Sequence, residues 1–84
     1  MTTLYYCKND QEVDLIMRFF EKEGYIWESG TALRSQYQNA PIIYCARQFN
    51  RKTLACCQRP DARDINNSLH VGAIRNKIIA ELRR

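Results

Sequence analysis

The sequence lacks the local patterns that commonly mark an active site. It has one histidine, His70, and it contains no glycine-rich phosphate loop, no HExxH motif and no serine within a GxSxG elbow. Because catalysis needs several converging groups, we expect a protein that is not an enzyme and that needs no cofactor. One alternative stays open, a thiol enzyme or redox protein that uses the adjacent Cys56 and Cys57, although adjacent cysteines pair with each other only under strain.

Long apolar segments and a secretion signal are missing as well. No run approaches the roughly 18–20 apolar residues of a membrane-spanning helix, and residues 1–6 lack the basic start and apolar stretch of a signal peptide. We therefore expect a cytoplasmic protein that does not contact a membrane. In that reducing compartment thiols stay free, and the spacing of the cysteines does not favour a metal site. The four thiols expected to stay free are Cys7, Cys45, Cys56 and Cys57.

Size and charge distribution favour a binding role. The 84 residues fit one domain, 1–84, which is close to the lower size limit for a stable hydrophobic core. Dimerisation or partner binding would stabilise such a domain, so a homodimer is one possibility. Residues 1–42 carry four Lys or Arg against six Asp or Glu, whereas residues 43–84 carry nine against three. A cationic second half favours an anionic partner, which is nucleic acid, a nucleotide or an acidic protein surface.

Helical periodicity is clearest between Asn9 and Gly24. Asn9 and Glu12 have the spacing of a capping box, and glycine at position 24 is typical of a helix end. Between them, apolar side chains recur at i, i+3, i+4 and i+7, namely at Val13, Ile16, Met17 and Phe20. This spacing predicts a helix over 10–23.

The strongest β signal is a hairpin, with strands over 42–48 and 53–58 joined by residues 49–52. In its first strand, Ile43 and Cys45 face one side, while Ile42, Tyr44 and Ala46 face the other. The remaining segments are predicted as a strand over 3–8, a strand over 25–28 beside it, a loop over 31–41 with at most one helical turn at 31–35, a charged connection over 59–64 and a second helix that begins near 66–68.

This order predicts a small α+β domain with the sequence of elements β-α-β-β-β-α. We expect a sheet of about four strands, antiparallel or mixed, with two helices on one face. Trp27 and the tyrosines then either fill the space between helices and sheet or stand on the open face of the sheet.

Basic residues bracket the predicted hairpin and the segment that follows it, at Arg47, Arg51, Lys52, Arg59 and Arg63. Five cations in one patch would bind phosphates, and Tyr44 and Phe49 would be available to stack on bases. The alternative is that these cations are ordinary surface charges that keep a strand edge from pairing with another chain. Sequence-specific reading of DNA is not expected, because neither predicted helix has a basic recognition face.

Residues 20–33 contain the pattern F-x-x-x-G-Y-x-W-x-S-G-x-x-L. With the preceding turns of helix, over residues 12–33, this segment resembles small accessory proteins of tailed bacteriophages and prophages. The resemblance implies a non-enzymatic protein of the host bacterial cytoplasm that binds and inhibits a host or antiviral-defence protein, for example a CRISPR interference complex. Direct binding of nucleic acid, or sequestration of a nucleotide signal, is the alternative. Folding alone also explains the pattern, since Gly24 and Gly30 suit turns, but Trp27 stays a candidate interface anchor.

Overall fold

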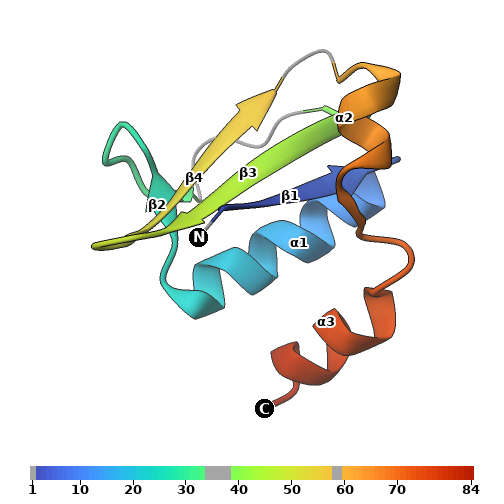
Figure 1. Ribbon diagram of the computed structural model, residues 1–84. Coiled ribbons are helices and arrows are strands. Elements are labelled where there is room, and N and C mark those ends of the chain that lie inside the picture. The colour runs from blue at the N-terminus through green and yellow to red at the C-terminus, as the bar shows by residue number, and fades with distance from the viewer. Residues whose placement is uncertain (1, 34–38, 58–59) are drawn as a thin grey trace.

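The computed structural model describes residues 2–33, 39–57 and 60–84, and these form a five-stranded mixed sheet and three helices (Figure 1). The α+β class predicted from the sequence is therefore confirmed. Along the chain the elements are β1 (Thr2–Cys7), α1 (Asp10–Glu23), β2 (Ile26–Trp27), β3 (Ile42–Gln48), β4 (Lys52–Cys57), α2 (Ala62–Asn66), β5 (Leu69–His70) and α3 (Arg75–Leu82).

Helix α1 has the bounds that its periodicity predicts. The side chain of Asn9 accepts a hydrogen bond from the Glu12 N–H at 3.0 Å, which satisfies one of the free donors of the first turn. Gly24 adopts a left-handed conformation, with φ 86, and the N–H of Tyr25 donates to the carbonyl of Phe20 at 3.0 Å. Local interactions that the sequence predicts thus end α1 on both sides.

The strand order is β2-β4-β3-β1-β5, with β3 antiparallel to both of its neighbours and the two outer pairings parallel. The connections β1–α1–β2 and β4–α2–β5 therefore cross the sheet in opposite directions. Because such crossovers are almost always right-handed, their helices lie on opposite faces. Figure 1 shows α1 and α3 below the sheet and α2 above it, beside the start of β3. We call the face covered by α1 and α3 the helix face and the other one the open face.

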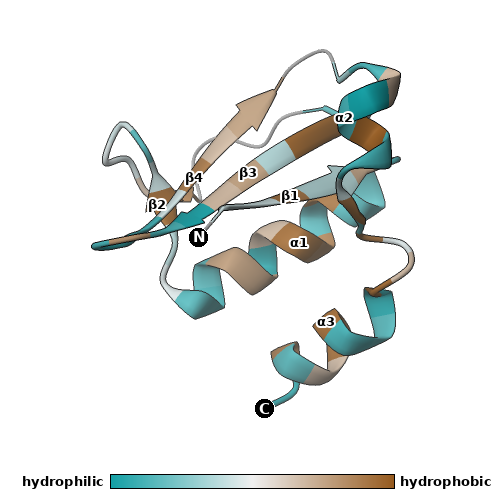
Figure 2. Ribbon diagram, viewed as in Figure 1, coloured by the Kyte–Doolittle hydropathy of each residue, from teal (hydrophilic) through white to brown (hydrophobic). Residues whose placement is uncertain are grey.

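The hydrophobic core lies between the helix face and α1. Phe20 is at its centre, with its ring centroid 4.9 Å from that of Tyr25 and 5.3 Å from that of Tyr5. Burial of this many aromatic rings supplies much of the apolar area that stabilises so small a domain. Figure 2 shows that β3 changes from hydrophobic at its start to hydrophilic at the hairpin. The core therefore ends before the hairpin, whose tip projects beyond it.

Several details of the predicted fold are wrong. The sheet has five strands instead of about four, since the two-residue strand β5 is too short for periodicity to reveal. Strand β2 pairs with β4 and not with β1, because α1 carries the chain across the whole sheet. The helices are not all on one face, since α2 lies over the open face. The predicted helical turn at 31–35 falls largely outside the described residues.

The single second helix predicted from 66–68 onward is also divided in two. Asp61 caps α2 by accepting a hydrogen bond from the Asp64 N–H at 2.8 Å, so this helix begins earlier than predicted. The Ser68 hydroxyl donates to the carbonyl of Ile65 at 2.8 Å and closes its end. Val71 then enters the core, and α3 begins only at Arg75. Side-chain caps, which compete with helix continuation, explain the interruption.

Candidate functional site

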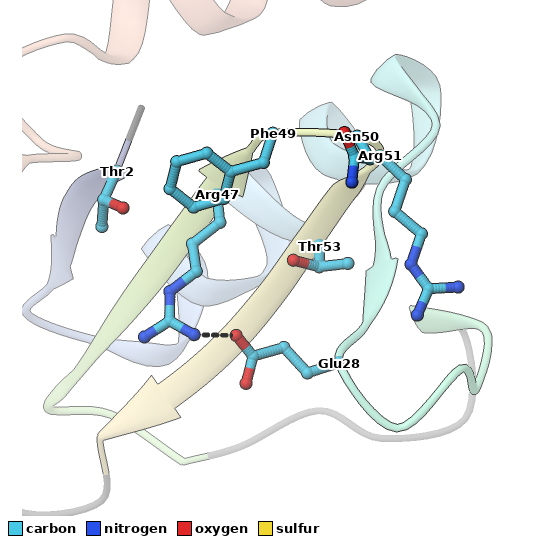
Figure 3. Close-up of a pocket in the computed structure, with 7 residues that line it drawn as sticks. All are labelled: Thr2, Glu28, Arg47, Phe49, Asn50, Arg51 and Thr53. Atoms are coloured by element: carbon cyan, nitrogen blue, oxygen red, sulfur yellow. Dashed lines mark hydrogen bonds and ion pairs between the residues drawn. The ribbon is translucent and has the colours of Figure 1, made fainter.

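An open concavity of about 580 Å³ lies at the hairpin end of the open face (Figure 3). The register of β1, β3 and β4 places Thr2, Arg47 and Thr53 side by side across these strands. Glu28, which follows β2, borders them, and its N–H donates to the carbonyl of Leu54 at 3.1 Å. The hairpin loop completes the lining, so that the whole set is Thr2, Glu28, Arg47, Phe49, Asn50, Arg51 and Thr53.

Arg47 and Glu28 form a hydrogen-bonded ion pair across the concavity (Figure 3). Their side chains keep 44% and 41% of their surface exposed, so the pair is in contact with water. Exposed pairs of this kind exchange readily with other charged groups, because solvent screens their attraction. The Arg47 guanidinium can therefore bind a carboxylate or phosphate of a partner in place of Glu28.

The hairpin tip presents an aromatic ring to solvent beside Arg47, and Arg51 follows in the same loop. Phe49 keeps 72% of its surface exposed and is one of two large exposed hydrophobic residues in the described ranges. Figure 3 shows the side chains of Arg47 and Arg51 extending in the same direction on either side of Thr53. The sequence predicted Arg47, Phe49 and Arg51 as binding residues, and the structure brings these three together.

Lys52 faces away from the concavity toward the end of α1. Its Nζ donates to the Glu23 carbonyl at 3.0 Å, lies 3.6 Å from the Glu23 carboxylate and is 5.8 Å from the centroid of the Tyr25 ring. These contacts tie the hairpin to α1, so Lys52 stabilises the fold at this point. Arg63 is exposed on α2, near the opposite end of the sheet, and Arg59 lies outside the described residues. The predicted single patch of five cations is thus not formed by the described ones.

Trp27 and Tyr44 belong to the core and are not available for stacking on a partner. Trp27 is 6% exposed and Tyr44 is fully buried, and their ring centroids are 6.1 Å apart. Both side chains point to the helix face, where α1 covers them. The prediction that they bind a partner is therefore wrong for this conformation, since burial leaves them no surface to offer.

Sequence reasoning missed four contributors to the concavity, and three of them, Thr2, Glu28 and Thr53, carry no local signal. Each is an ordinary polar residue in its own segment, and only the pairing of β1, β3, β4 and β2 brings them together. Asn50 could have been found, because it lies between two predicted binding residues in a hairpin loop.

The four thiols differ in burial, and burial raises the pKa of two of them, Cys7 and Cys56. All four are free: Cys7 is buried, Cys45 and Cys56 are half-buried and Cys57 is exposed. Burial, and secondarily the negative charge of Glu12, raise the pKa of Cys7 to about 12. Burial also raises the pKa of Cys56, which lowers its share of reactive thiolate. Within the described ranges, no three metal-ligating side chains cluster and no helix is long and apolar enough to cross a membrane.

The concavity offers groups that can form hydrogen bonds, ion pairs and apolar contacts. It supplies two guanidinium groups, one carboxylate, two hydroxyls, one amide and one phenyl ring. Fold and site together define a small α+β domain with an open, arginine-lined hollow at one end of its sheet. Comparisons of the chain with protein-family models, with curated proteins and with solved structures find no match.

Proposed function

We propose that this protein works by binding another protein through the hairpin end of its sheet. The observation that carries the proposal is the exposed ring of Phe49, which lies beside Arg47 in the concavity that Arg51 also lines. Aromatic and arginine side chains are the residues that most often dominate the energy of a protein interface. An aromatic ring held in water on a hairpin tip has no role in the core, since α1 and the sheet are packed without it.

The biological role we propose is that of a phage-type accessory protein that inhibits a host or antiviral-defence protein, such as a CRISPR interference complex. This part rests on the resemblance of residues 12–33 to phage accessory proteins. A small non-enzymatic domain of this kind acts stoichiometrically, by occupying a surface that its target needs.

The charge distribution favours a protein partner over nucleic acid. Proteins that follow a phosphate backbone place many cations along one surface. Here Glu28 offsets part of the positive charge of the concavity, and Lys52 is engaged with α1. The other described cations of the second half lie on different elements, at Arg63 on α2 and at Arg75, Lys77, Arg83 and Arg84 on or beside α3. A mixed-charge surface with an aromatic ring is typical of protein interfaces.

A capture experiment tests the proposal. The wild-type protein and two variants are immobilised and incubated with bacterial lysate, and retained proteins are quantified by mass spectrometry. Phe49→Ser removes the exposed ring, whereas Leu69→Ser removes the other large exposed hydrophobic side chain, which lies on β5. We expect a bacterial protein that is retained by wild type and by Leu69→Ser and lost with Phe49→Ser. Retention of no protein, or equal retention by both variants, would contradict the proposal.

Binding of nucleic acid or a nucleotide is the second candidate, and one observation favours it. Phe49 and Arg51 both line the concavity, and a base can stack on the ring while a guanidinium contacts a phosphate. Fluorescence anisotropy with a labelled single strand of about 20 nucleotides and with a labelled cyclic dinucleotide tests this candidate. Binding that weakens steeply between about 50 and 200 mM salt, and that Arg51→Ala abolishes, would support it over the first.

A further inference from the structure

The open face carries three rows of side chains across β1, β3 and β4. The register sets these rows, because residues directly opposite each other on paired strands point to the same face. The first row belongs to the concavity and consists of Thr2, Arg47 and Thr53. The second row is Leu4, Cys45 and Ala55, and the third row is Tyr6, Ile43 and Cys57.

The second row is apolar and only partly covered. Leu4, Cys45 and Ala55 are all half-buried, whereas Ile43 in the third row is 1% exposed. Along β3, burial therefore decreases from Ile43 to Cys45, away from the start of the strand, where Figure 1 shows α2. A sheet face in contact with water usually carries polar side chains. An apolar row in this position departs from that pattern.

The apolar row, Leu4, Cys45 and Ala55, is continuous with the concavity. Leu4 is two residues from Thr2 on β1, and Cys45 is two residues from Arg47 on β3, so both rows share one surface. An apolar centre bordered by polar and charged groups is the usual arrangement of a protein interface. The charged border is specific, since guanidinium groups prefer planar carboxylates, which they bind with two parallel hydrogen bonds.

We infer that the partner is an acidic protein segment that places an aliphatic or aromatic side chain on the Leu4–Cys45–Ala55 row and a carboxylate against Arg47 or Arg51. The inference rests on the proposed function and adds the chemistry of the partner. The binding surface then extends from the hairpin tip along the open face and is larger than the concavity alone.

Three synthetic hexapeptides test this chemistry by isothermal calorimetry. The first has leucine and phenylalanine at its centre and two aspartates on each side. In the second, two serines replace the central pair, and in the third, lysines replace the aspartates. We expect the first peptide to bind at least about tenfold more tightly than either control, because burying one large apolar side chain is worth about that factor or more. Equal binding of the first two peptides, or no binding of the first, overturns the inference.

Variants separate this inference from the proposed function. Leu4→Thr keeps a strand-favouring residue in the apolar row, and Leu69→Thr makes the same change at an exposed position on β5. We expect Leu4→Thr to lower the affinity for the first hexapeptide about tenfold. Leu69→Thr should leave this affinity unchanged. If Arg51→Ala weakens binding while Leu4→Thr does not, the hairpin binds the partner and the apolar row does not. In that case the inference is wrong and the proposed function stands.

The natural thiols provide a readout that needs no variant. Cys45 and Cys57 lie on the open face, whereas Cys7 and Cys56 lie on the helix face. Iodoacetamide alkylation, followed by peptide mass spectrometry, measures each thiol separately. When the first hexapeptide is saturating, most protein molecules have it bound and Cys45 is covered. We therefore expect the alkylation rate of Cys45 to fall at least about threefold. The alkylation rate of Cys56 should not change. Unchanged alkylation of Cys45 under saturating peptide would overturn the inference even if every variant were misfolded.

Discussion

The ion pair between Arg47 and Glu28 controls how strongly the concavity attracts an acidic partner. Both side chains are more than two-fifths exposed, so the pair contributes about 0.2–1 kcal/mol to folding, as exposed pairs usually do. A partner carboxylate that binds Arg47 must displace Glu28 or share the guanidinium with it. Part of the affinity is therefore lost to competition within the protein itself.

Two substitutions have opposite expected effects on binding. Glu28→Gln keeps the shape of the side chain but removes the competing charge, so affinity for an acidic partner should rise about 1.4- to 5-fold, which corresponds to 0.2–1 kcal/mol. Arg47→Ala removes a charge-assisted hydrogen bond worth about 1.5–3 kcal/mol, so affinity should fall about ten- to 150-fold. Neither change should lower the free energy of unfolding by more than about 1 kcal/mol.

Affinity is measured by calorimetry with the aspartate-flanked hexapeptide, and stability by urea denaturation. The matched control is the exposed pair Arg18 and Asp14 on α1, whose charged atoms are 3.0 Å apart. Asp14→Asn and Arg18→Ala should leave binding unchanged. The reasoning is refuted if Glu28→Gln weakens binding, because Glu28 would then be a contact and not a competitor. It is also refuted if Arg47→Ala lowers the free energy of unfolding by more than about 2 kcal/mol, well above the range for exposed pairs.

Two further predictions concern stability. Gly24→Ala should lower the free energy of unfolding by about 1–2 kcal/mol, because Gly24 ends α1 in a left-handed conformation with φ 86. The control Gln11→Ala, at an exposed position of α1, should change the free energy of unfolding by less than about 0.5 kcal/mol. Burial raises the pKa of Cys7 from 9.0 to about 12, so the unfolded chain loses this proton first. The free energy of unfolding should therefore fall as pH rises from 9 toward 12. Its slope should be steeper in wild type than in Cys7→Ala, by up to about 1.4 kcal/mol per pH unit. Equal slopes in the two proteins would contradict this prediction.

Local signals predicted the elements whose causes are local. Helix α1 needed only a capping residue, an apolar stripe and a terminal glycine, and each of these lies within the helix or next to it. The capping box that the sequence predicts is formed in part, because the Glu12 carboxylate accepts from the N–H of Lys8 and not from that of Asn9. The hairpin needed two β-favouring runs and a short loop. Strand β5 has two residues and exists because Tyr5 and Tyr6 of β1 pair with Leu69 and His70. The residues that pair with β5 lie more than sixty positions earlier in the sequence. Local sequence patterns carry no information about so distant a pairing.

The burial of Tyr44 shows a related gap. Alternation along β3 correctly grouped Tyr44 with Ile42 and Ala46, and opposite to Ile43 and Cys45. It did not say which of the two groups would face α1, because that depends on how the β1–α1–β2 crossover passes over the sheet. The ring predicted to stack on a partner is therefore a core residue.

The two adjacent cations of the hairpin show why charge counts overestimate a basic patch. Arg51 lines the concavity, whereas Lys52 reaches the end of α1 and contacts Glu23 there. Lys52 begins β4, whereas Arg51 belongs to the hairpin loop before it, so two neighbouring cations lie on different surfaces. On the surface that holds Arg51, Glu28 offsets the charge of Arg47. Of the four predicted cations that the structure describes, only Arg47 and Arg51 line the concavity, where they lie with one aromatic ring and one carboxylate. This mixture of groups is the reason we propose a protein partner instead of a phosphate backbone.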